Sequence, residues 1–205
     1  MSLTSHSFHS WEEDFFRAGF SRIAGVDEVG RGCLAGPVIA ASVILPLDQR
    51  ISGVRDSKKL TPKKRESLFD KILFQSLAYG IGLVEVAEID HINIFQATIK
   101  AMLLSVQSLI LPPDLVVIDG NITLPLSIQQ RSIIGGDDLC YSIAAASIVA
   151  KVTRDRLMRV MASEYPGYGF DRHKGYGTLA HREAIKTLGV TPQHRRTFRG
   201  VSEFC

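Results

Sequence analysis

Apolar and polar residues follow one another along this chain in blocks that predict mixed strands and helices. Short runs rich in β-branched residues predict strands at residues 23–26, 38–45, 81–86 and 115–118, and one more ending near residue 134. Apolar positions three and four residues apart predict helices at residues 8–16, 61–73, 95–109, 142–164 and 179–188. Because the final third is mostly helical, the pattern indicates an α/β fold with a mixed sheet and a helical C-terminal extension.

Turn and capping residues support several of these boundaries. Thr61 and Pro62 form a favourable helix start, an N-cap followed by proline in the first turn. Asp119 stands between an apolar run and a Gly-Asn pair, which is typical of a strand that ends in a turn. We expect three segments: an N-terminal segment at residues 1–21, the α/β domain at 22–165, and the helical extension at 166–205.

Charge is unevenly distributed along the chain. The net charge is only +3, but residues 1–150 hold 13 Lys/Arg against 16 Asp/Glu, whereas residues 151–205 hold 11 against 5. A basic C-terminal third suggests an acidic partner such as nucleic acid, although solvated surface lysines and arginines would give the same count. A second basic cluster at residues 55–65 is open to the same two interpretations.

The first residues and the cysteines predict an intracellular protein. The first twenty residues contain three acidic side chains and no apolar core, so we expect neither a signal peptide nor a membrane anchor. The three cysteines, Cys33, Cys140 and Cys205, are scattered and include no Cys-x-x-Cys pair, which favours a reducing compartment and no structural zinc. We expect the protein to be cytoplasmic.

Four carboxylates stand where chemistry would be expected. Asp27 and Glu28 follow an apolar strand, Asp119 ends another, and Asp137 precedes the long helix. Converging carboxylates bind Mg²⁺, and a pair of such ions can activate water against a phosphodiester. The alternatives are a turn residue at Asp119, a helix cap at Asp137 and an ordinary strand end. Adjacent strand residues also point to opposite faces, so a site that uses both Asp27 and Glu28 requires the strand to bulge or stop there.

The glycine-rich run at residues 25–32 has the glycine spacing of a phosphate-binding P-loop. However, Arg31 and Gly32 stand where that motif requires Lys and then Ser or Thr, and two carboxylates inside the run would repel phosphate. A loop that brings its backbone close to a sugar–phosphate chain beside a metal site fits these residues better.

This run, GVDEVGRGCLAGPV at residues 25–38, resembles the first signature of bacterial ribonuclease HII. The resemblance continues, in family order, through DSKKL (56–60), IDGN (118–121), GD (136–137), SIAAASIVAKVTRD (142–155), YPGYGF (165–170), HKGYGT (173–178), His181 and the His194-Arg195 pair. The blocks extend over about residues 23–198. Together they are far more specific than any one alone.

The resemblance implies a ribonuclease H-like mixed sheet flanked by helices, with Asp27, Glu28, Asp119 and Asp137 binding two Mg²⁺ or Mn²⁺ ions. It implies an endonuclease acting on RNA–DNA hybrids and on DNA duplexes with embedded ribonucleotides. The cut would fall on the 5′ side of a ribonucleotide, leaving 3′-hydroxyl and 5′-phosphate ends, with no obligatory protein partner. The implied substrate-binding residues are Gly30, Arg31, Gly32, Ser57, Lys58, Lys59, Lys151 and Tyr176.

Among these residues, the loop at 30–32 would sense the 2′-hydroxyl and Tyr176 would pack on the sugar of the next deoxyribonucleotide. The lysines would contact phosphates without reading sequence. The chain departs from the family pattern at Gly135, where Lys is common, and at residues 138–140. The rival interpretations are another two-metal nuclease of the same fold, and a nucleic-acid-binding module without catalysis.

Overall fold

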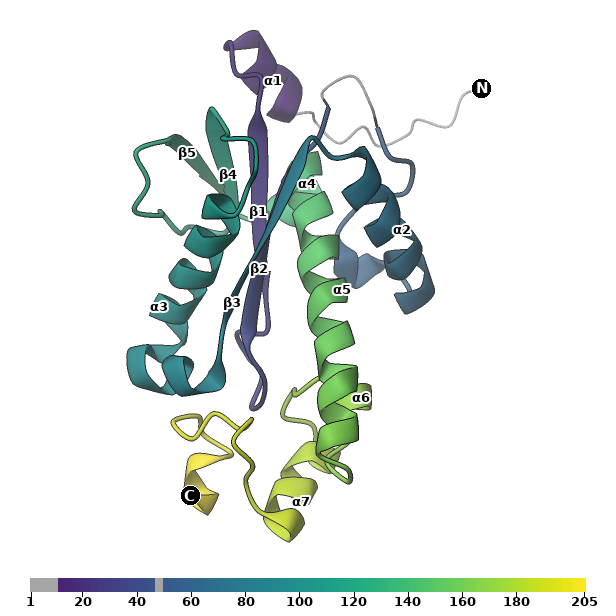
Figure 1. Cartoon of the computed structure of the whole chain (residues 1–205), viewed down its shortest axis with the longest axis vertical. Coiled ribbons are helices and arrows are strands. Elements are labelled where there is room, and N and C mark those ends of the chain that lie inside the picture. The colour runs from purple at the N-terminus through teal and green to yellow at the C-terminus, as the bar shows by residue number, and fades with distance from the viewer. Residues whose placement is uncertain (1–10, 47–49) are drawn as a thin grey trace.

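The computed structural model describes residues 11–46 and 50–205, and in these ranges a five-stranded mixed sheet forms the centre of the molecule (Figure 1). The strands are β1 (Ile23–Val29), β2 (Val38–Ile44), β3 (Ala78–Val84), β4 (Leu115–Asp119) and β5 (Gln129–Ile133), in the spatial order β3-β2-β1-β4-β5. The first three form an antiparallel meander, and β4 and β5 lie parallel to β1. The predicted mixed sheet is confirmed.

Helices cover both faces of this sheet. The helices of the described residues are α1 (Trp11–Arg17), α2 (Pro62–Gln75), α3 (Val86–Gln107), α4 (Gly136–Leu139), α5 (Tyr141–Glu164), α6 (Phe170–His173) and α7 (Leu179–Leu188), with short 3-10 turns η1 (Ser57–Lys59) and η2 (Ser202–Phe204). Helix α3 lies against one face, and α5 with α2 lies against the other (Figure 1). The C-terminal segment after α5 gathers at the lower end of the sheet, beside the connection between β1 and β2.

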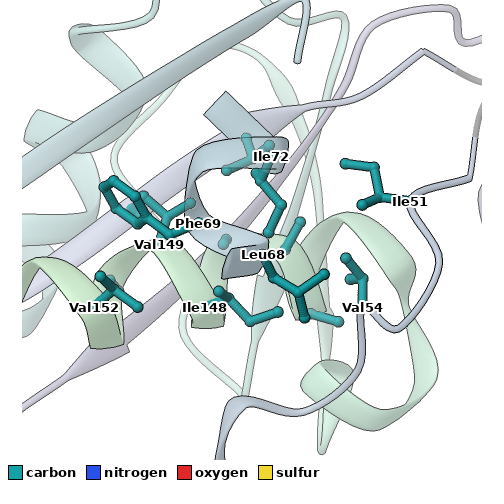
Figure 2. Close-up of a cluster of buried hydrophobic side chains, with 14 of the residues drawn as sticks. Ile51, Val54, Leu68, Phe69, Ile72, Ile148, Val149 and Val152 are labelled. Atoms are coloured by element: carbon teal, nitrogen blue, oxygen red, sulfur yellow. The ribbon is translucent and has the colours of Figure 1, made fainter. Parts of the chain in front are cut away.

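The packing of α2 onto α5 follows from the apolar stripe of α2. Thr61 caps α2 by accepting a hydrogen bond from the amide of Lys64 at 3.3 Å, as the sequence predicted. Leu68 and Ile72 then point into a cluster with Ile148 of α5 (Figure 2). Each such side chain stabilises the fold by about 1.5–3 kcal/mol when fully buried. This layer holds α5 firmly across the sheet.

Several predicted boundaries were wrong. The strand expected at residues 23–26 continues to Val29, because β1 stays paired with β2 as far as that residue. The strand expected at residues 81–86 is β3, which begins at Ala78 and ends at Val84, because it pairs with β2 along that whole length. The helix expected from residue 95 begins at Val86 instead. It is kinked at Asn93, whose φ of 67° interrupts the helical spacing, and Phe95 just beyond the kink is 48% exposed instead of facing the core. The predicted helix at 8–16 appears as α1, although residues 8–10 lie outside the described residues.

A close approach between β1 and α5 brings the sheet onto the start of that helix. A side chain at Gly25 would lie 2.1 Å from the main chain of Ser142, so only glycine allows this approach. The small residues at 144–147 of α5 are buried alongside. Among the described residues, no helix is long and apolar enough to cross a membrane.

Candidate metal centre and substrate pocket

The parallel pairing of β1 with β4 brings two of the predicted carboxylates together. The paired region ends at Val26 opposite Ile118. The next residue on each strand, Asp27 and Asp119, therefore lies at the same end of the sheet and on the same face. Parallel strands end at a common edge, where ligands of open α/β sheets collect.

The third carboxylate comes from the short helix α4. Gly135 adopts a left-handed φ of 68° before this helix, and the amide of Gly136 donates a 2.7 Å hydrogen bond to Oδ1 of Asp119. Asp137 follows directly. One carboxylate oxygen from each of Asp27, Asp119 and Asp137 lies within 4.8 Å of the other two. A compact set of oxygen donors is the kind that Mg²⁺ and Mn²⁺ prefer.

The electrostatics of this group favour a cation. Burial raises the pKa of Asp27 well above its ordinary value, and the charges of Glu28 and Asp119 raise it further. Burial raises the pKa of Asp119 as well, with Asp137 as the next cause. Buried carboxylates that repel one another are costly unless a positive charge lies among them. Asp137 does not cap α5, because α5 begins after Cys140 without a side-chain cap.

Glu28 stands apart from these three carboxylates. The strand neither bulges nor stops, since β1 stays paired with β2 through Asp27 opposite Ala41 and Glu28 opposite Ala40. Ala41 packs toward α5 and Ala40 toward α3, so the two acidic side chains point to opposite faces. Arg31 donates a 3.3 Å hydrogen bond to Glu28. Burial raises the pKa of Glu28, Arg31 opposes this, and Asp119 adds to the rise.

Two lysines from η1 reach the same end of the sheet. Nζ of Lys58 lies 2.9 Å from Oδ2 of Asp137, and this hydrogen bond raises the pKa of the lysine. Nζ of Lys59 lies 2.7 Å from both carboxylate oxygens of Asp138. Ser57, in contrast, is buried with its hydroxyl 2.8 Å from that of Ser147. The basic cluster is therefore partly paired with acidic residues.

A pocket of about 200 Å³ opens beside the carboxylates. It is lined by Asp27, Glu28, Val29, Gly30, Arg31, Gly32, Lys58, Asp119 and Tyr176. Tyr176 reaches it because Cys33, just after the loop at 30–32, pairs with Tyr176 in an isolated bridge. The tyrosine is 43% exposed. Segments far apart in the sequence thus form one pocket around two of the three clustered carboxylates.

The two glycines of the loop serve different purposes. Gly30 has a φ of 99°, and a side chain there would lie 2.4 Å from Nε of Arg154, so both its conformation and its packing require glycine. A side chain at Gly32, in contrast, would have no neighbouring atom within 4 Å. Packing within the protein therefore does not explain the missing side chain at Gly32, whereas close approach of a ligand would.

A larger groove of about 640 Å³ adjoins this pocket at Tyr176, which lines both. Its basic side chains come from α2, α5 and the region of α6: Lys63, Arg65, Lys151, Arg159, Arg172 and Lys174. Acidic neighbours temper their charge, and Lys151 lies 2.7 Å from Asp155. The groove continues the pocket with a positively charged wall.

Two buried arginines and three histidines lie close to the connection between β1 and β2, and their sequence pattern predicted no role for them. Arg154 and Arg195 are fully buried, and His181 and His194 are buried with their Nε2 atoms 3.1 Å apart. His173 stacks on His181 with ring centroids 4.3 Å apart. Burial lowers the pKa of both His181 and His194 to about 4, so we expect both rings to be neutral at pH 7. The sequence offered one sign of a buried arginine, because Arg154 stands among the apolar residues of the buried face of α5.

A mixed sheet with helices on both faces is the architecture of the ribonuclease H-like class, and the carboxylates clustered at the ends of its parallel strands are a candidate metal site of that class. The family model described as Ribonuclease HII matches residues 24–201. The chain belongs to the ribonuclease HII family and is a ribonuclease H, a hydrolytic nuclease of a metal-dependent family.

Individual relatives agree with this assignment. The chain is 55% identical to ribonuclease HII of Geotalea uraniireducens over 92% of its own length and 87% of that protein. Among solved structures, ribonuclease H2 from Pyrococcus horikoshii OT3 superposes with a TM-score of 0.78 at 28% identity, covering 89% of this chain and 96% of that one. Bst-RNase HIII in complex with Mn²⁺ shares the fold, with a TM-score of 0.67 at 16% identity, over 89% of this chain and 68% of that one.

Proposed function

We propose that the enzyme hydrolyses the phosphodiester on the 5′ side of a ribonucleotide, in RNA–DNA hybrids and in DNA duplexes with embedded ribonucleotides. The products would carry a 3′-hydroxyl upstream and a 5′-phosphate on the ribonucleotide. The observation that carries this proposal is the position of Asp27 and Asp119 in one pocket with the loop at 30–32 and Tyr176. The carboxylates would serve the chemistry, and the loop and the tyrosine would select the nucleotide.

Asp27, Asp119 and Asp137 would hold the metal, Mg²⁺ or Mn²⁺. Glu28 would be the fourth ligand: its side chain points to the other face of β1, but it lines the same pocket, and the charge of Asp119 raises its pKa. The Mn²⁺ complex of Bst-RNase HIII supports this choice of ion. When bound, a pair of such ions lowers the pKa of the attacking water and stabilises the leaving 3′ oxygen. The all-oxygen donor set within 4.8 Å fits these ions.

The other residues would bind and orient the substrate. The loop at 30–32 would meet the 2′-hydroxyl, because Gly32 leaves open space there. Tyr176 would pack on the sugar of the next deoxyribonucleotide, at the junction between the pocket and the groove. Lys58, Lys59 and Lys151 would contact phosphates and fix the register. Ser57 is buried and would contribute indirectly, because its hydrogen bond with Ser147 holds η1, which carries Lys58 and Lys59, against α5.

The test is cleavage of a DNA duplex with one ribonucleotide, in Mg²⁺, in Mn²⁺ and in chelator, using the purified chain alone. We expect metal-dependent cutting on the 5′ side of the ribonucleotide, with the ends identified by ligation and by phosphatase treatment. Asp119→Asn should abolish cutting. Asp70→Asn is the matched control, since its side chain is 77% exposed on α2 and it should cut normally.

Other outcomes identify the rival functions. Cutting of a long RNA–DNA hybrid but not of the single-ribonucleotide duplex would indicate a nuclease that needs a run of ribonucleotides. Retained duplex binding without cutting of either substrate would indicate a binding module. Cutting that persists in chelator would remove the assigned role of the carboxylates.

A further inference from the structure

The connection between β1 and β2 is held in shape by the C-terminal segment. The amide of Leu34 donates a 2.8 Å hydrogen bond to the carbonyl of Gly175, and the amide of Gly36 donates one of 2.8 Å to Gln193. The amide of Arg195 in turn donates to Leu34 at 2.8 Å. Residues 33–36 therefore run between two C-terminal stretches, around residues 175 and 194, and do not form a free loop.

Two buried guanidinium groups complete this arrangement. Arg195 donates to the carbonyl of Arg31 at 3.0 Å, and to the carbonyl of Gly36 at 3.0 and 2.7 Å. Arg154 of α5 donates to the carbonyls of Ala35, Pro37 and Lys174 at 2.7–3.0 Å. In the described part of the chain, all the hydrogen bonds of both groups go to main-chain carbonyl oxygens.

A buried guanidinium without a carboxylate partner is an unusual way to use charge. Removing it from water is costly, and charge-assisted hydrogen bonds to carbonyl dipoles must offset that cost. Burial lowers the pKa of Arg195 to about 10, which leaves it positively charged at neutral pH. The planar fork of arginine can bind two carbonyl groups in fixed directions, which an ammonium group cannot do. The fork therefore constrains the orientation of the peptide groups at Arg31 and Gly36.

The orientation of the peptide after Arg31 matters for the pocket. In a planar trans peptide the carbonyl and the following amide point in opposite directions. Because Arg195 draws the Arg31 carbonyl inward, the amide of Gly32 points away from it. No residue of the described chain accepts a hydrogen bond from that amide, and Gly32 lines the pocket. A hydrogen-bond donor is thus fixed where a ribose would lie.

We infer that Arg195 is a positioning residue for ribonucleotide recognition, acting through the main chain of Arg31 and Gly32, with Arg154 supporting the far end of the same connection. This inference rests on the proposed function, in which the loop at 30–32 senses the 2′-hydroxyl. The C-terminal segment would accordingly shape the specificity pocket as well as provide positive charge. Arg195 is fully buried and lines neither the pocket nor the groove, so it would act only through the main chain.

The test compares binding of two duplexes that differ in one 2′-hydroxyl, by fluorescence anisotropy with Ca²⁺ in place of Mg²⁺. The wild type should bind the ribonucleotide duplex more tightly than its all-deoxy counterpart. Arg195→Lys should reduce this preference about tenfold, the equivalent of one hydrogen bond, while affinity for the all-deoxy duplex stays within about twofold. Partial unfolding would lower both affinities equally and leave their ratio unchanged. Arg196→Lys, on an exposed neighbour, is the matched control and should keep the wild-type ratio.

Two failures are distinguishable. A wild type without preference for the ribonucleotide would overturn the proposed function of the loop. A wild-type preference that Arg195→Lys retains in full would overturn the inference about Arg195 alone. If Arg195→Lys does not fold, hydrogen exchange on the wild type decides. The amide hydrogens of Leu34, Gly36 and Arg195 should then exchange at one slow rate. Rapid exchange at Leu34 and Gly36 while the amide of Arg195 stays protected would overturn the inference.

Discussion

Replacing Asp27 by asparagine should stabilise the metal-free protein while it destroys activity. The folded protein raises the pKa of Asp27, so the ionised carboxylate opposes folding. At pH values below the unfolded pKa the carboxyl is protonated in both states and contributes nothing. As the pH rises above that value, stability is lost until the folded pKa is passed. Asparagine removes this loss and keeps the oxygen that accepts the 2.7 Å hydrogen bond from the amide of Glu28.

The magnitude follows from the spacing of the carboxylates. Two ionised carboxylates no more than 4.8 Å apart repel each other by about 3 kcal/mol at an effective dielectric constant of roughly 20. Lys58 offsets part of this repulsion through Asp137. We therefore expect a net gain of about 2 kcal/mol at pH 8, and a rise in Tm of about 4–8 °C for a chain of this length.

The assay is thermal unfolding of wild type and Asp27→Asn at pH 5 and pH 8, in chelator and in Mn²⁺. The advantage of the variant should grow from pH 5 to pH 8 in chelator. Mn²⁺ at a hundred times its Kd should stabilise the wild type by about 2.7 kcal/mol and the variant by much less. A variant that is less stable than the wild type in chelator at pH 8, or equally stabilised by Mn²⁺, would refute the reasoning.

Asp114→Asn is the contrasting control. Burial raises the pKa of Asp114, but hydrogen bonds from Arg22 and Ser21 outweigh this and lower it overall. The amides of Ser21 and Arg22 lie 3.0 and 2.9 Å from its oxygens. Its ionised form therefore favours folding, so the same substitution should reduce Tm at pH 8. A pair of aspartates with opposite responses separates a functional carboxylate from a structural one.

Three further predictions concern binding and pH. Asp138→Asn should free Lys59 to contact a phosphate and so tighten duplex binding. The slope of log binding constant against log salt concentration should become steeper by about 0.9. Lys59→Gln in the same background should reverse both changes. Tyr176→Phe should keep kcat/KM on a single-ribonucleotide duplex within about twofold, whereas Tyr176→Ala should lose about tenfold, and equal losses would exclude packing by the ring. Burial lowers the pKa of His181 and His194 to about 4, below the unfolded value of about 6.5. Each histidine therefore stabilises the folded protein above pH 6.5, and this stabilisation is lost as the pH falls toward 4. The loss should reach about 2 kcal/mol for each histidine by pH 5. NMR should show both imidazoles neutral at pH 5, and titration near pH 6.5 would contradict this.

The sequence predicted most reliably the elements whose pattern is local. The helices α2, α5 and α7 begin within a residue of their predicted starts, because capping residues and apolar stripes depend only on neighbours in the chain. The start of α3 was wrong because the left-handed Asn93 breaks the periodicity inside one helix. The short helices α4 and α6 were missed, since four residues are too few to show a period.

The site divides in the same way. Asp27 and Asp119 could be predicted to meet because each follows directly on an apolar run, and parallel strands share an edge. That Glu28 points to the other face depends on β1 continuing past Asp27, which the pairing with β2 determines and the local pattern does not. The support given by Arg195 could not be predicted, because its hydrogen-bond partners are carbonyl groups, which every residue type carries.

The hydrogen bonds of Arg195 also have a consequence for biosynthesis. Its partners Gly36 and Arg31 lie 159 and 164 residues earlier in the chain. During translation the sheet strands and all the clustered carboxylates leave the ribosome before this arginine does, and domains generally fold from the N-terminal end as they emerge. A nascent chain, or one shortened by a late stop codon, would therefore carry the clustered carboxylates while the loop at 30–32 still lacked the hydrogen bonds of Arg195. Recognition of the substrate would then be the last property that this chain acquires during its synthesis.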